Sequence, residues 1–472
     1  MKRALLFFCL ALVSTYSEAQ NWIDTNYNYQ LTANVVYGNA LDFAGNLRSL
    51  DMDVCVPTND VPPACGRPLL VMIHGGSFIS GTKNDIVPQA IMKDFAKRGY
   101  VTASVNYRLG MFETSNNIHC NIGNGWDCLN MADTAEWLRA NYRAMQDVKG
   151  AIRYMIVHAT DYNIDARNVF VAGESAGAIT ALNVAYLDDN SEKYAATYAL
   201  PDAAAPNANY DAQCVQTYGF DTSIASMALQ RPDLGSTGGD LNPGGSNYTL
   251  KAVGSFYGGM FTNLFNVNNY ATPPAAYLYH QPNDLLVPYT SDRVLAGYAY
   301  CAVTMGGCQY IVNRPYIAGG KGMTTYINAL PLASQPQYLF DSTNNNADCL
   351  QQINDPATIG HAIDNYALRT LHMAQLFAGK IDTTQPCGVT GLDQLNANDG
   401  KLDIYPNPAT GTMCINVQNE KILSAILVDI QGKKITLSSN GSTYDLSAAK
   451  PGMYMLWVVT ERNSYVGKII KR

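Results

Sequence analysis

The sequence predicts an α/β fold followed by a small all-β domain, and two observations carry this prediction. Short apolar, β-branched runs alternate with helix-length segments up to about residue 380, which is typical of βαβ units and a mainly parallel sheet. Beyond residue 401, short apolar segments are separated by Gly and Asn turns, as in an antiparallel β-sandwich. With 47% hydrophobic and 15% charged residues, the 472-residue chain can bury a large core.

The N-terminus has the pattern of a secretory signal peptide. Lys2 and Arg3 precede the apolar run 4–13, and the small residues Ser17 and Ala19 follow. This run is too short for the roughly 30 Å core of a bilayer, so we expect a signal peptide over residues 1–19 rather than a membrane anchor. We expect no other transmembrane segment. The net charge of −7, without a basic stripe, argues against binding to nucleic acid.

Cysteine usage agrees with export to an oxidising compartment. Cys9 leaves with the signal peptide, and three pairs lie close together in loop-like sequence: Cys55 with Cys65, Cys120 with Cys128, and Cys301 with Cys308. Such spacing favours local disulfides. Cys349 with Cys387 is a further candidate pair, whereas Cys214 and Cys414 are unassigned. Since no Cys-x-x-Cys pair or cluster of His occurs, we expect no metal site.

Six apolar runs are predicted strands, and two stretches with helical spacing are predicted helices. The strands are 69–73, 101–106, 169–172, 252–256, 276–280 and 338–341, and the helices are 86–97 and 134–158. Residues 188–248 break this rhythm, because they are rich in Ala, Asn, Asp, Gly and Pro. A long irregular insertion is usually functional or mobile. We interpret it as a cap over the active-site end of the sheet, with a peripheral excursion as the alternative.

A domain boundary is expected at about residues 390–401, where Gly, Asn and Asp cluster. It separates a catalytic domain over residues 20–395 from a C-terminal domain over residues 401–472. The predicted strands of the C-terminal domain are 413–417, 425–429, 434–437 and 453–459.

The most informative motif is Gly173-Glu174-Ser175-Ala176-Gly177, which follows the predicted strand 169–172 directly. A serine on a tight strand-to-helix turn needs small neighbours, and the turn exposes its hydroxyl at a helix N-terminus that favours developing negative charge. Gly-x-Ser-x-Gly alone can arise by chance, but this strand–turn–helix context is much more specific. Ser175 is therefore the predicted nucleophile.

A second motif, His74-Gly75-Gly76-Ser77-Phe78, ends the predicted strand 69–73. Its glycines would let backbone N–H groups face a substrate oxygen, and with the N–H of Ala176 they would form an oxyanion hole. A structural glycine turn is the alternative. His74 precedes the nucleophile in the chain, so we expect it to brace this loop rather than act as the catalytic base.

The acid and the base follow the nucleophile when a triad of this type runs in the order Ser, acid, His. Asp284 lies just past the predicted strand 276–280 and is the expected acid, with a helix N-cap as its alternative role. Two histidines remain downstream. His361 follows a loop and is the preferred base, because the base needs an imidazole within about 3 Å of the serine hydroxyl. His372 lies within a helical pattern and is better explained by packing.

Residues 45–380 resemble α/β-hydrolases of the carboxylesterase and lipase group. The resemblance rests on the two motifs above and on three further segments: Asn106-Tyr107-Arg108-Leu109-Gly110, residues 146–153, and Asn163-Ile164-Asp165. It implies that Gly76 and Ser77 are the oxyanion-hole donors beside Ala176, with Gly75 shaping the turn. The usual third glycine of the His-Gly-Gly-Gly motif is Ser77 here. The sequence around Asp284 resembles that of smaller esterases and polysaccharide-deacylating relatives, which leaves the substrate open.

The C-terminal domain resembles the type A sorting domain of the type IX secretion system. The resemblance rests on four ordered motifs: Tyr405-Pro406-Asn407-Pro408, residues 429–433, Pro451-Gly452-Met453-Tyr454, and the basic end 468–472. It implies that the tail is an export address, read by the secretion machinery and commonly removed. A carbohydrate-binding sandwich is the alternative, but no cluster of Trp or Tyr suggests a sugar-stacking platform.

Together these features predict a secreted or surface-attached serine ester hydrolase that needs no cofactor. Its substrate would be a small or polysaccharide-linked ester. Two other functions remain open: a serine peptidase on the same fold, and a catalytically silent surface-binding protein, because fold alone does not determine function.

Overall fold

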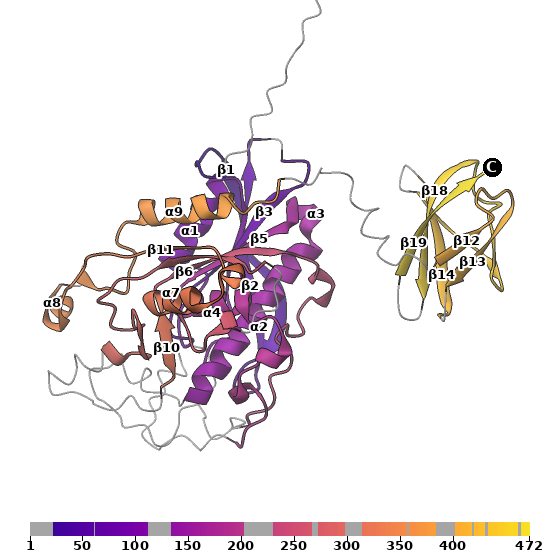
Figure 1. The fold of residues 1–472 in the computed structure, drawn as a ribbon. Helices are drawn as coiled ribbons and strands as arrows, with labels where there is room; N and C mark the ends of the chain where they lie inside the picture. The colour runs from indigo at the N-terminus through magenta and orange to yellow at the C-terminus, as the bar shows by residue number, and fades with distance from the viewer. Residues whose placement is uncertain are drawn as a thin grey trace, which may run out of the picture. The chain divides into compact units, whose positions relative to one another are not determined.

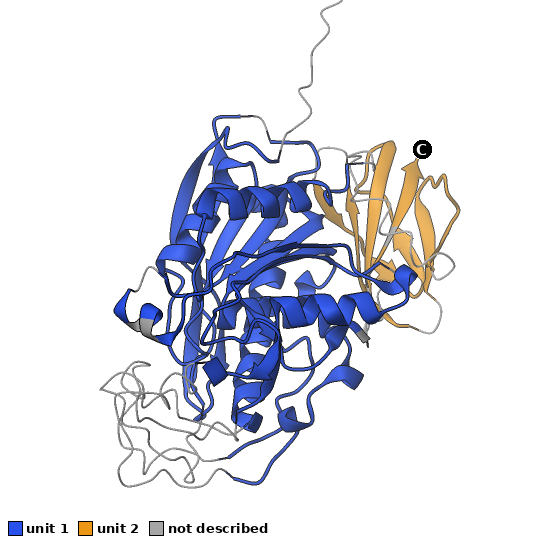
Figure 2. Cartoon of the chain, turned by 60° about the vertical axis from the view of Figure 1, so that its left-hand side comes forward, with its two compact units in different colours: residues 1–384 blue, residues 385–472 orange. Residues whose placement is uncertain are grey.

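The protein is described by a computed structural model that covers residues 22–60, 62–111, 134–202, 230–266, 272–297, 314–355, 358–383, 402–417, 420–429, 433–460 and 464–472. The chain divides into two compact units, residues 1–384 and 385–472, coloured blue and orange in Figure 2. The expected signal peptide and the expected boundary at residues 390–401 lie outside the described residues.

The first unit is built on an eight-stranded sheet in the order β1-β2-β4-β3-β5-β6-β8-β11. Figure 1 labels β1, β2, β3, β5, β6 and β11 of this sheet. Its strands, in chain order, are β1 (Asn28–Leu41), β2 (Leu47–Thr58), β3 (Arg67–Ile73), β4 (Val101–Val105), β5 (Ile164–Glu174), β6 (Leu250–Phe256), β8 (Ala275–Tyr279) and β11 (Tyr338–Asp341). Only the β1–β2 and β2–β4 pairs are antiparallel. This mostly parallel sheet confirms the predicted α/β class.

Helices cover both faces of this sheet, which is why its central strands are continuous apolar runs. One face packs against α1 (Ile86–Lys97) and α9 (Tyr366–Ala378) in a core that includes Phe95, Phe170 and Phe377. The other face packs against α2 (Thr134–Val157), α4 (Ala176–Tyr186) and α7 (Gly320–Ala329). Two shorter helices are α3 (Ala159–Tyr162) and α8 (Cys349–Asn354). A small sheet of β7 (Gly259–Met260), β10 (Tyr316–Gly319) and β9 (Ser291–Arg293) lies in this unit.

The register of the parallel strands brings their carboxyl ends to one edge of the sheet. Ile73 pairs with Gly173, Glu174 pairs with Phe256, and Phe256 pairs with Tyr279. The segments that follow β3, β5, β6 and β8 therefore start side by side. In open α/β sheets this edge is where ligands bind.

The described parts of the insertion at 188–248 pack along α2. They contain the short 3₁₀ turns η2 (Asn190–Glu192), η3 (Ala195–Thr197) and η5 (Pro243–Gly245). Arg139 near the start of α2 donates to the carbonyls of Ala196 and Tyr198, and Arg153 near its end donates to that of Leu241. Residues 203–229, where a cap remains the prediction, lie outside the described residues.

The second unit is a sandwich of two four-stranded sheets, in the orders β12-β13-β17-β16 and β15-β14-β18-β19. Its strands are β12 (Leu402–Tyr405), β13 (Thr412–Val417), β14 (Ile422–Val428), β15 (Lys434–Thr436), β16 (Ser439–Asn440), β17 (Thr443–Asp445), β18 (Gly452–Thr460) and β19 (Ser464–Lys471). Every pair within the two sheets is antiparallel. The predicted all-β C-terminal domain is confirmed.

One expected disulfide is wrong. Cys55 is a free thiol, fully buried in β2, so it does not pair with Cys65, which is disulfide-bonded. Burial raises the pKa of the Cys55 thiol to about 12, because the thiolate would be poorly solvated there. Cys414 is also free. The expected pairings of Cys120 with Cys128 and of Cys301 with Cys308, and the partner suggested for Cys349, lie outside the described residues.

Candidate active site

Ser175 lies on a tight turn between β5 and α4. Its backbone has φ 53° and ψ −124°, a conformation that is uncommon for a residue with a side chain. The turn is possible because glycines flank it. A Cβ atom at Gly173 would lie 2.3 Å from the carbonyl of Gly177, and one at Gly177 would lie 2.3 Å from the carbonyl oxygen of Ile73. The two glycines thus let α4 approach both β5 and β3 at distances that a side chain would prevent.

The loop after β3 lies against this turn. A Cβ atom at Gly75 would be 3.1 Å from the Cβ of Ser175, which places the loop beside the serine. The next three residues, Gly76, Ser77 and Phe78, all have positive φ, at 105°, 54° and 62°. Phe78 is fully buried and contacts the ring of Trp137, so this unusual conformation is held by packing.

Three backbone N–H groups at this point have no acceptor within the described part of the chain. Among the described residues, the N–H groups of Gly76, Ser77 and Ala176 donate to no protein acceptor. Orphaned N–H groups are rare in a folded chain unless they bind water or a ligand. Those of Gly76, Ser77 and Ala176 are the donors that the resemblance implies for an oxyanion hole.

The structure brings Ser175, His361 and Asp284 together. His361 Nε2 lies 2.8 Å from Ser175 Oγ, and His361 Nδ1 lies 2.7 Å from Asp284 Oδ2. Asp284 follows β8, and no helix begins at it, so the N-cap alternative does not apply. His361 precedes α9 on a loop, and its side chain is 10% exposed. A substrate could therefore reach the imidazole from one side while Asp284 is sealed from solvent on the other.

Asp284 is held as a carboxylate by its hydrogen bonds. Burial opposes its ionisation, but the charge of His361 and hydrogen bonds from His280 and His361 outweigh burial and lower the pKa of Asp284 to about 2. The backbone N–H groups of Leu286 and Val287 also donate to its Oδ1 atom, at 2.8 and 3.1 Å. The carboxylate is thus both ionised and fixed in orientation.

A tyrosine–glutamate pair lies beside the imidazole. Tyr257 is 3% exposed, its hydroxyl donates to Glu174, and its ring centroid is 4.6 Å from that of His361. Burial raises the pKa of Glu174, an effect that the hydrogen bond from Tyr257 and the charge of His361 partly offset. Neither residue was predicted from the sequence, although Glu174 stands within the serine motif.

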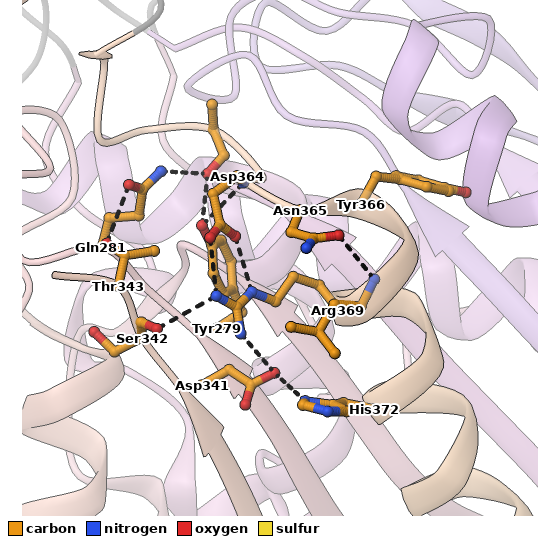
Figure 3. A network of polar contacts seen from close by, with 12 residues as sticks. Tyr279, Gln281, Asp341, Ser342, Thr343, Asp364, Asn365, Tyr366, Arg369 and His372 are labelled. Carbon is orange, nitrogen blue, oxygen red and sulfur yellow. Dashed lines mark hydrogen bonds and ion pairs between the residues drawn. The ribbon is translucent and has the colours of Figure 1, made fainter. Parts of the chain in front are cut away.

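The loop that carries His361 is anchored by a polar network behind it (Figure 3). Arg369 on α9 binds Asp364 through two hydrogen bonds of 2.8 and 2.9 Å. Tyr279 at the end of β8 donates to the carbonyl of Ala362 and accepts from the N–H of Asp364. Gln281 also donates to the Ala362 carbonyl, at 2.8 Å. These contacts fix the segment that directly follows His361.

The remaining histidines have structural environments. His74 is fully buried, stacks on Tyr107, and donates from Nδ1 to the carbonyl of Gly75, which fits the expected bracing role. Burial lowers the pKa of His74 to about 4. His372 on α9 contacts Asp341 at 2.8 Å and is not brought to Ser175. His280 contacts Asp284 at 3.0 Å, a role that was not predicted from the sequence.

Within the described ranges, no group of His, Cys, Asp and Glu side chains is arranged to hold a metal ion, and no helix has the length and apolar character needed to cross a membrane.

Comparison with known proteins agrees with the fold and the motifs. Residues 45–197 match the model of the carboxylesterase family, and residues 403–472 match the model of a secretion system C-terminal sorting domain. These matches confirm both resemblances. The sorting domain indicates export by type IX secretion to the cell surface or the extracellular space.

Solved esterase structures are also similar to this chain. Esterase 2 of Thermogutta terrifontis, phosphoramylated by tabun, is 16% identical over 76% of this chain and 97% of its own, with a TM-score of 0.37. Esterase B of Lactobacillus rhamnosis is 12% identical over 75% of this chain and 87% of its own, with a TM-score of 0.36.

Proposed function

We propose that this exported ester hydrolase of the α/β-hydrolase fold cleaves carboxylic esters through an acyl-enzyme formed on Ser175. One observation carries the proposal: two successive hydrogen bonds, of 2.8 and 2.7 Å, link Ser175 Oγ to His361 and His361 to Asp284. A nucleophile within hydrogen-bond reach of a base, with the base oriented by a third group, is the arrangement that activates a serine.

In the first half-reaction, Ser175 Oγ attacks the ester carbonyl carbon while His361 Nε2 accepts the hydroxyl proton. The carbonyl oxygen becomes an oxyanion, which the N–H groups of Gly76, Ser77 and Ala176 would stabilise, since they donate to no acceptor among the described residues. His361 then gives its proton to the departing alcohol oxygen, and the C–O bond breaks. The acyl group stays on Ser175.

In the second half-reaction, water attacks the acyl carbon and His361 accepts its proton. The proton then passes to Ser175 Oγ as the carboxylic acid leaves. Asp284, whose pKa is lowered to about 2, remains ionised throughout and stabilises the imidazolium that forms twice in the cycle. Apart from the ester and the attacking water, every group in this scheme belongs to the chain, so we expect no requirement for a cofactor.

The test uses the full chain and its Ser175→Ala variant with p-nitrophenyl acetate, butyrate and octanoate. We expect hydrolysis by the parent, and a rate at least about 10³-fold lower for the variant, since the nucleophile is lost. A fluorophosphonate should add its phosphonyl mass to the parent at Ser175 and not to the variant. Melting temperatures within about 3 °C of each other would show that both chains are folded.

Other outcomes discriminate the alternatives. A folded parent that ignores esters but cleaves peptide p-nitroanilides would be a serine peptidase. A folded parent inert toward both, and unlabelled by the fluorophosphonate, would be a silent binding protein. Comparing the p-nitrophenyl esters with feruloylated oligosaccharides would separate small from polysaccharide-linked substrates.

A further inference from the structure

The carboxylate of Asp284 contacts a second imidazole besides that of His361. His361 Nδ1 and His280 Nε2 both lie at hydrogen-bond distance from Asp284 Oδ2, at 2.7 and 3.0 Å. The side chains of His280 and Asp284 are both 0% exposed, so neither contact is shared with solvent. A triad needs only the first contact.

The backbone of Gly320 determines which nitrogen of His280 carries the proton. The N–H of Gly320 donates to His280 Nδ1 at 2.9 Å, so Nδ1 must present its lone pair. The proton therefore lies on Nε2, where two acceptors face it: Asp284 Oδ2 and the carbonyl oxygen of Val287, each at 3.0 Å. His280 is thus a neutral hydrogen-bond donor to the carboxylate.

The corner between β10 and α7 holds the ring of His280 in place. A Cβ atom at Gly319 would lie 1.8 Å from the carbonyl oxygen of Pro288 and 2.9 Å from His280 Cε1. A Cβ atom at Gly320 would lie 2.7 Å from the Cβ of His280. Because only glycine fits at both positions, backbone presses directly against the histidine. Tyr289 closes the other side, with its ring centroid 5.8 Å away.

We propose that His280 is a positioning residue that orients the carboxylate of Asp284 and moderates its charge. This inference rests on the proposed function of Ser175, His361 and Asp284. By donating to Oδ2, His280 fixes the oxygen that His361 needs and withdraws part of its negative charge. A hydrogen bond to a carboxylate stabilises its charged form and weakens its pull on other protons. His280 therefore makes the base easier to deprotonate at mildly acidic pH.

Two amide variants separate the contact of His280 with Asp284 from its contact with Gly320. In His280→Asn the amide reaches only the position of Nδ1, so it can accept from Gly320 but gives Asp284 no donor. In His280→Gln the amide nitrogen reaches the position of Nε2, so it can donate to Asp284 but gives Gly320 no acceptor. His158→Gln is the matched control, because His158 lies at the surface with Asp161.

We expect His280→Asn to lower kcat about 10- to 100-fold on p-nitrophenyl butyrate, with KM within about twofold, because the carboxylate is misaligned. The acidic limb of its kcat/KM profile should move upward by about half a pH unit or more. His280→Gln should keep the parent profile and lose at most about threefold in kcat, despite a lower melting temperature. His158→Gln should match the parent in both.

Several outcomes would overturn the proposal. Parent kcat and an unshifted pH profile in folded His280→Asn would make the contact with Asp284 incidental. Equal losses in both variants without a pH shift would make His280 a packing residue only. Should His280→Asn not fold, the result for His280→Gln decides, and a shifted profile there contradicts the proposal. Hydrolysis by Ser175→Ala equal to that of the parent would instead reject the proposed function itself.

Discussion

The hydroxyl of Tyr257 donates a 2.6 Å hydrogen bond to Glu174 Oε2, and the ring of the same tyrosine lies against the imidazole of His361. Burial raises the pKa of Glu174, while this hydrogen bond and the charge of His361 lower it. Two effects on Glu174 therefore oppose each other. Its ionised form can stabilise the imidazolium of His361, whereas its burial favours the neutral acid. Two consequences can be measured by replacing it.

The first prediction is that Glu174→Gln becomes less active but more stable. Without a carboxylate near His361, the imidazolium loses stabilisation, so the acidic limb of the kcat/KM profile should move to lower pH and kcat/KM should fall several-fold. The stability effect follows from linkage. Because the pKa of Glu174 is raised in the folded state, the unfolded chain ionises first as pH rises, and the parent loses stability there.

The measurement is urea unfolding at pH 4 and pH 7 beside a pH–rate profile. Glu174→Gln should exceed the parent in free energy of unfolding at pH 7, and the difference should shrink at pH 4, where most of the glutamate is protonated in both states. Tyr257→Phe should act in the opposite sense, because it removes the donor that stabilises the charged form. A stability difference that grows toward low pH contradicts the assignment.

A second prediction concerns Arg369, which binds the loop of the base through Asp364 (Figure 3). Arg369→Met should lower kcat about tenfold with little change in KM, because misplacing the base by a fraction of an ångström penalises proton transfer. The free energy of unfolding should fall by about 2 kcal/mol, since Arg369 is 8% exposed and its partner is only partly buried. Steady-state kinetics and urea titration provide both values.

Two control variants show whether kcat depends on the paired N–H donors of Arg369 or only on its charge. Arg369→Lys keeps the charge but not the paired N–H donors, so an intermediate kcat is expected. Arg48→Met removes an ion pair with Asp42 near the β1–β2 turn and should leave kcat at the parent value. Equal kcat for parent and Arg369→Met would show that the loop does not need this anchor.

A third prediction concerns a buried ion pair between Lys83 and Asp53, which are 2% and 4% exposed. Lys83 Nζ lies 2.6 Å from Asp53 Oδ1, and it also donates to Asn34. Lys83→Met should cost about 3–5 kcal/mol of unfolding free energy, because it leaves a buried carboxylate without its partner. The double variant Lys83→Met/Asp53→Leu should recover at least half of that loss.

Urea titration of the parent, of the single variants Lys83→Met and Asp53→Leu, and of the double variant gives the coupling energy between the two residues. Lys97→Met, at the exposed end of α1, is the control and should change stability by less than about 0.5 kcal/mol. If the double variant is less stable than Lys83→Met alone, the stability loss in Lys83→Met does not come from leaving the Asp53 carboxylate without its partner.

A fourth prediction concerns the serine turn. Gly177→Ala would place a methyl group 2.3 Å from the carbonyl oxygen of Ile73 and 2.4 Å from that of His74. Since both neighbours are backbone, α4 must move away from β3, and Ala176 then moves from the loop of Gly76. We expect kcat/KM to fall at least about 100-fold. Gly244→Ala, whose nearest neighbour is 4.0 Å away, should keep parent activity.

The central, continuously buried strands of the large sheet were predicted from the sequence, whereas the β1–β2 hairpin at its edge was missed. Every residue of β3 is buried, so its apolar run is continuous and easily read. By contrast, β1 carries exposed Leu31 and Val36, and its pairing with β2 is interrupted by bulges. The sequence of β1 therefore shows neither simple alternation nor a continuous apolar run. For this reason the antiparallel β1–β2 hairpin was not predicted.

In the candidate site, local motifs could be recognised in the sequence, whereas contacts between distant residues could not. Ser175, Asp284 and His361 could be selected because the order of a triad along the chain and a local motif restrict the choice. The roles of Glu174 and Tyr257 arise from a contact across 83 residues, and that of His280 depends on Gly320, 40 residues away. Such contacts leave no periodicity or spacing in the sequence, so only the folded chain reveals them.

The separation between Ser175 and His361 also bears on how the chain folds. Their hydrogen bond links residues that are 186 positions apart, and the docking of α9 on β8 and β11 helps to hold the loop of His361 through Arg369 and Tyr279. Contacts of such long range form late, because the entropy of closing the intervening chain must be lost first. During refolding, far-ultraviolet circular dichroism should therefore recover before ester hydrolysis does. The lag between the two signals would time the docking of α9.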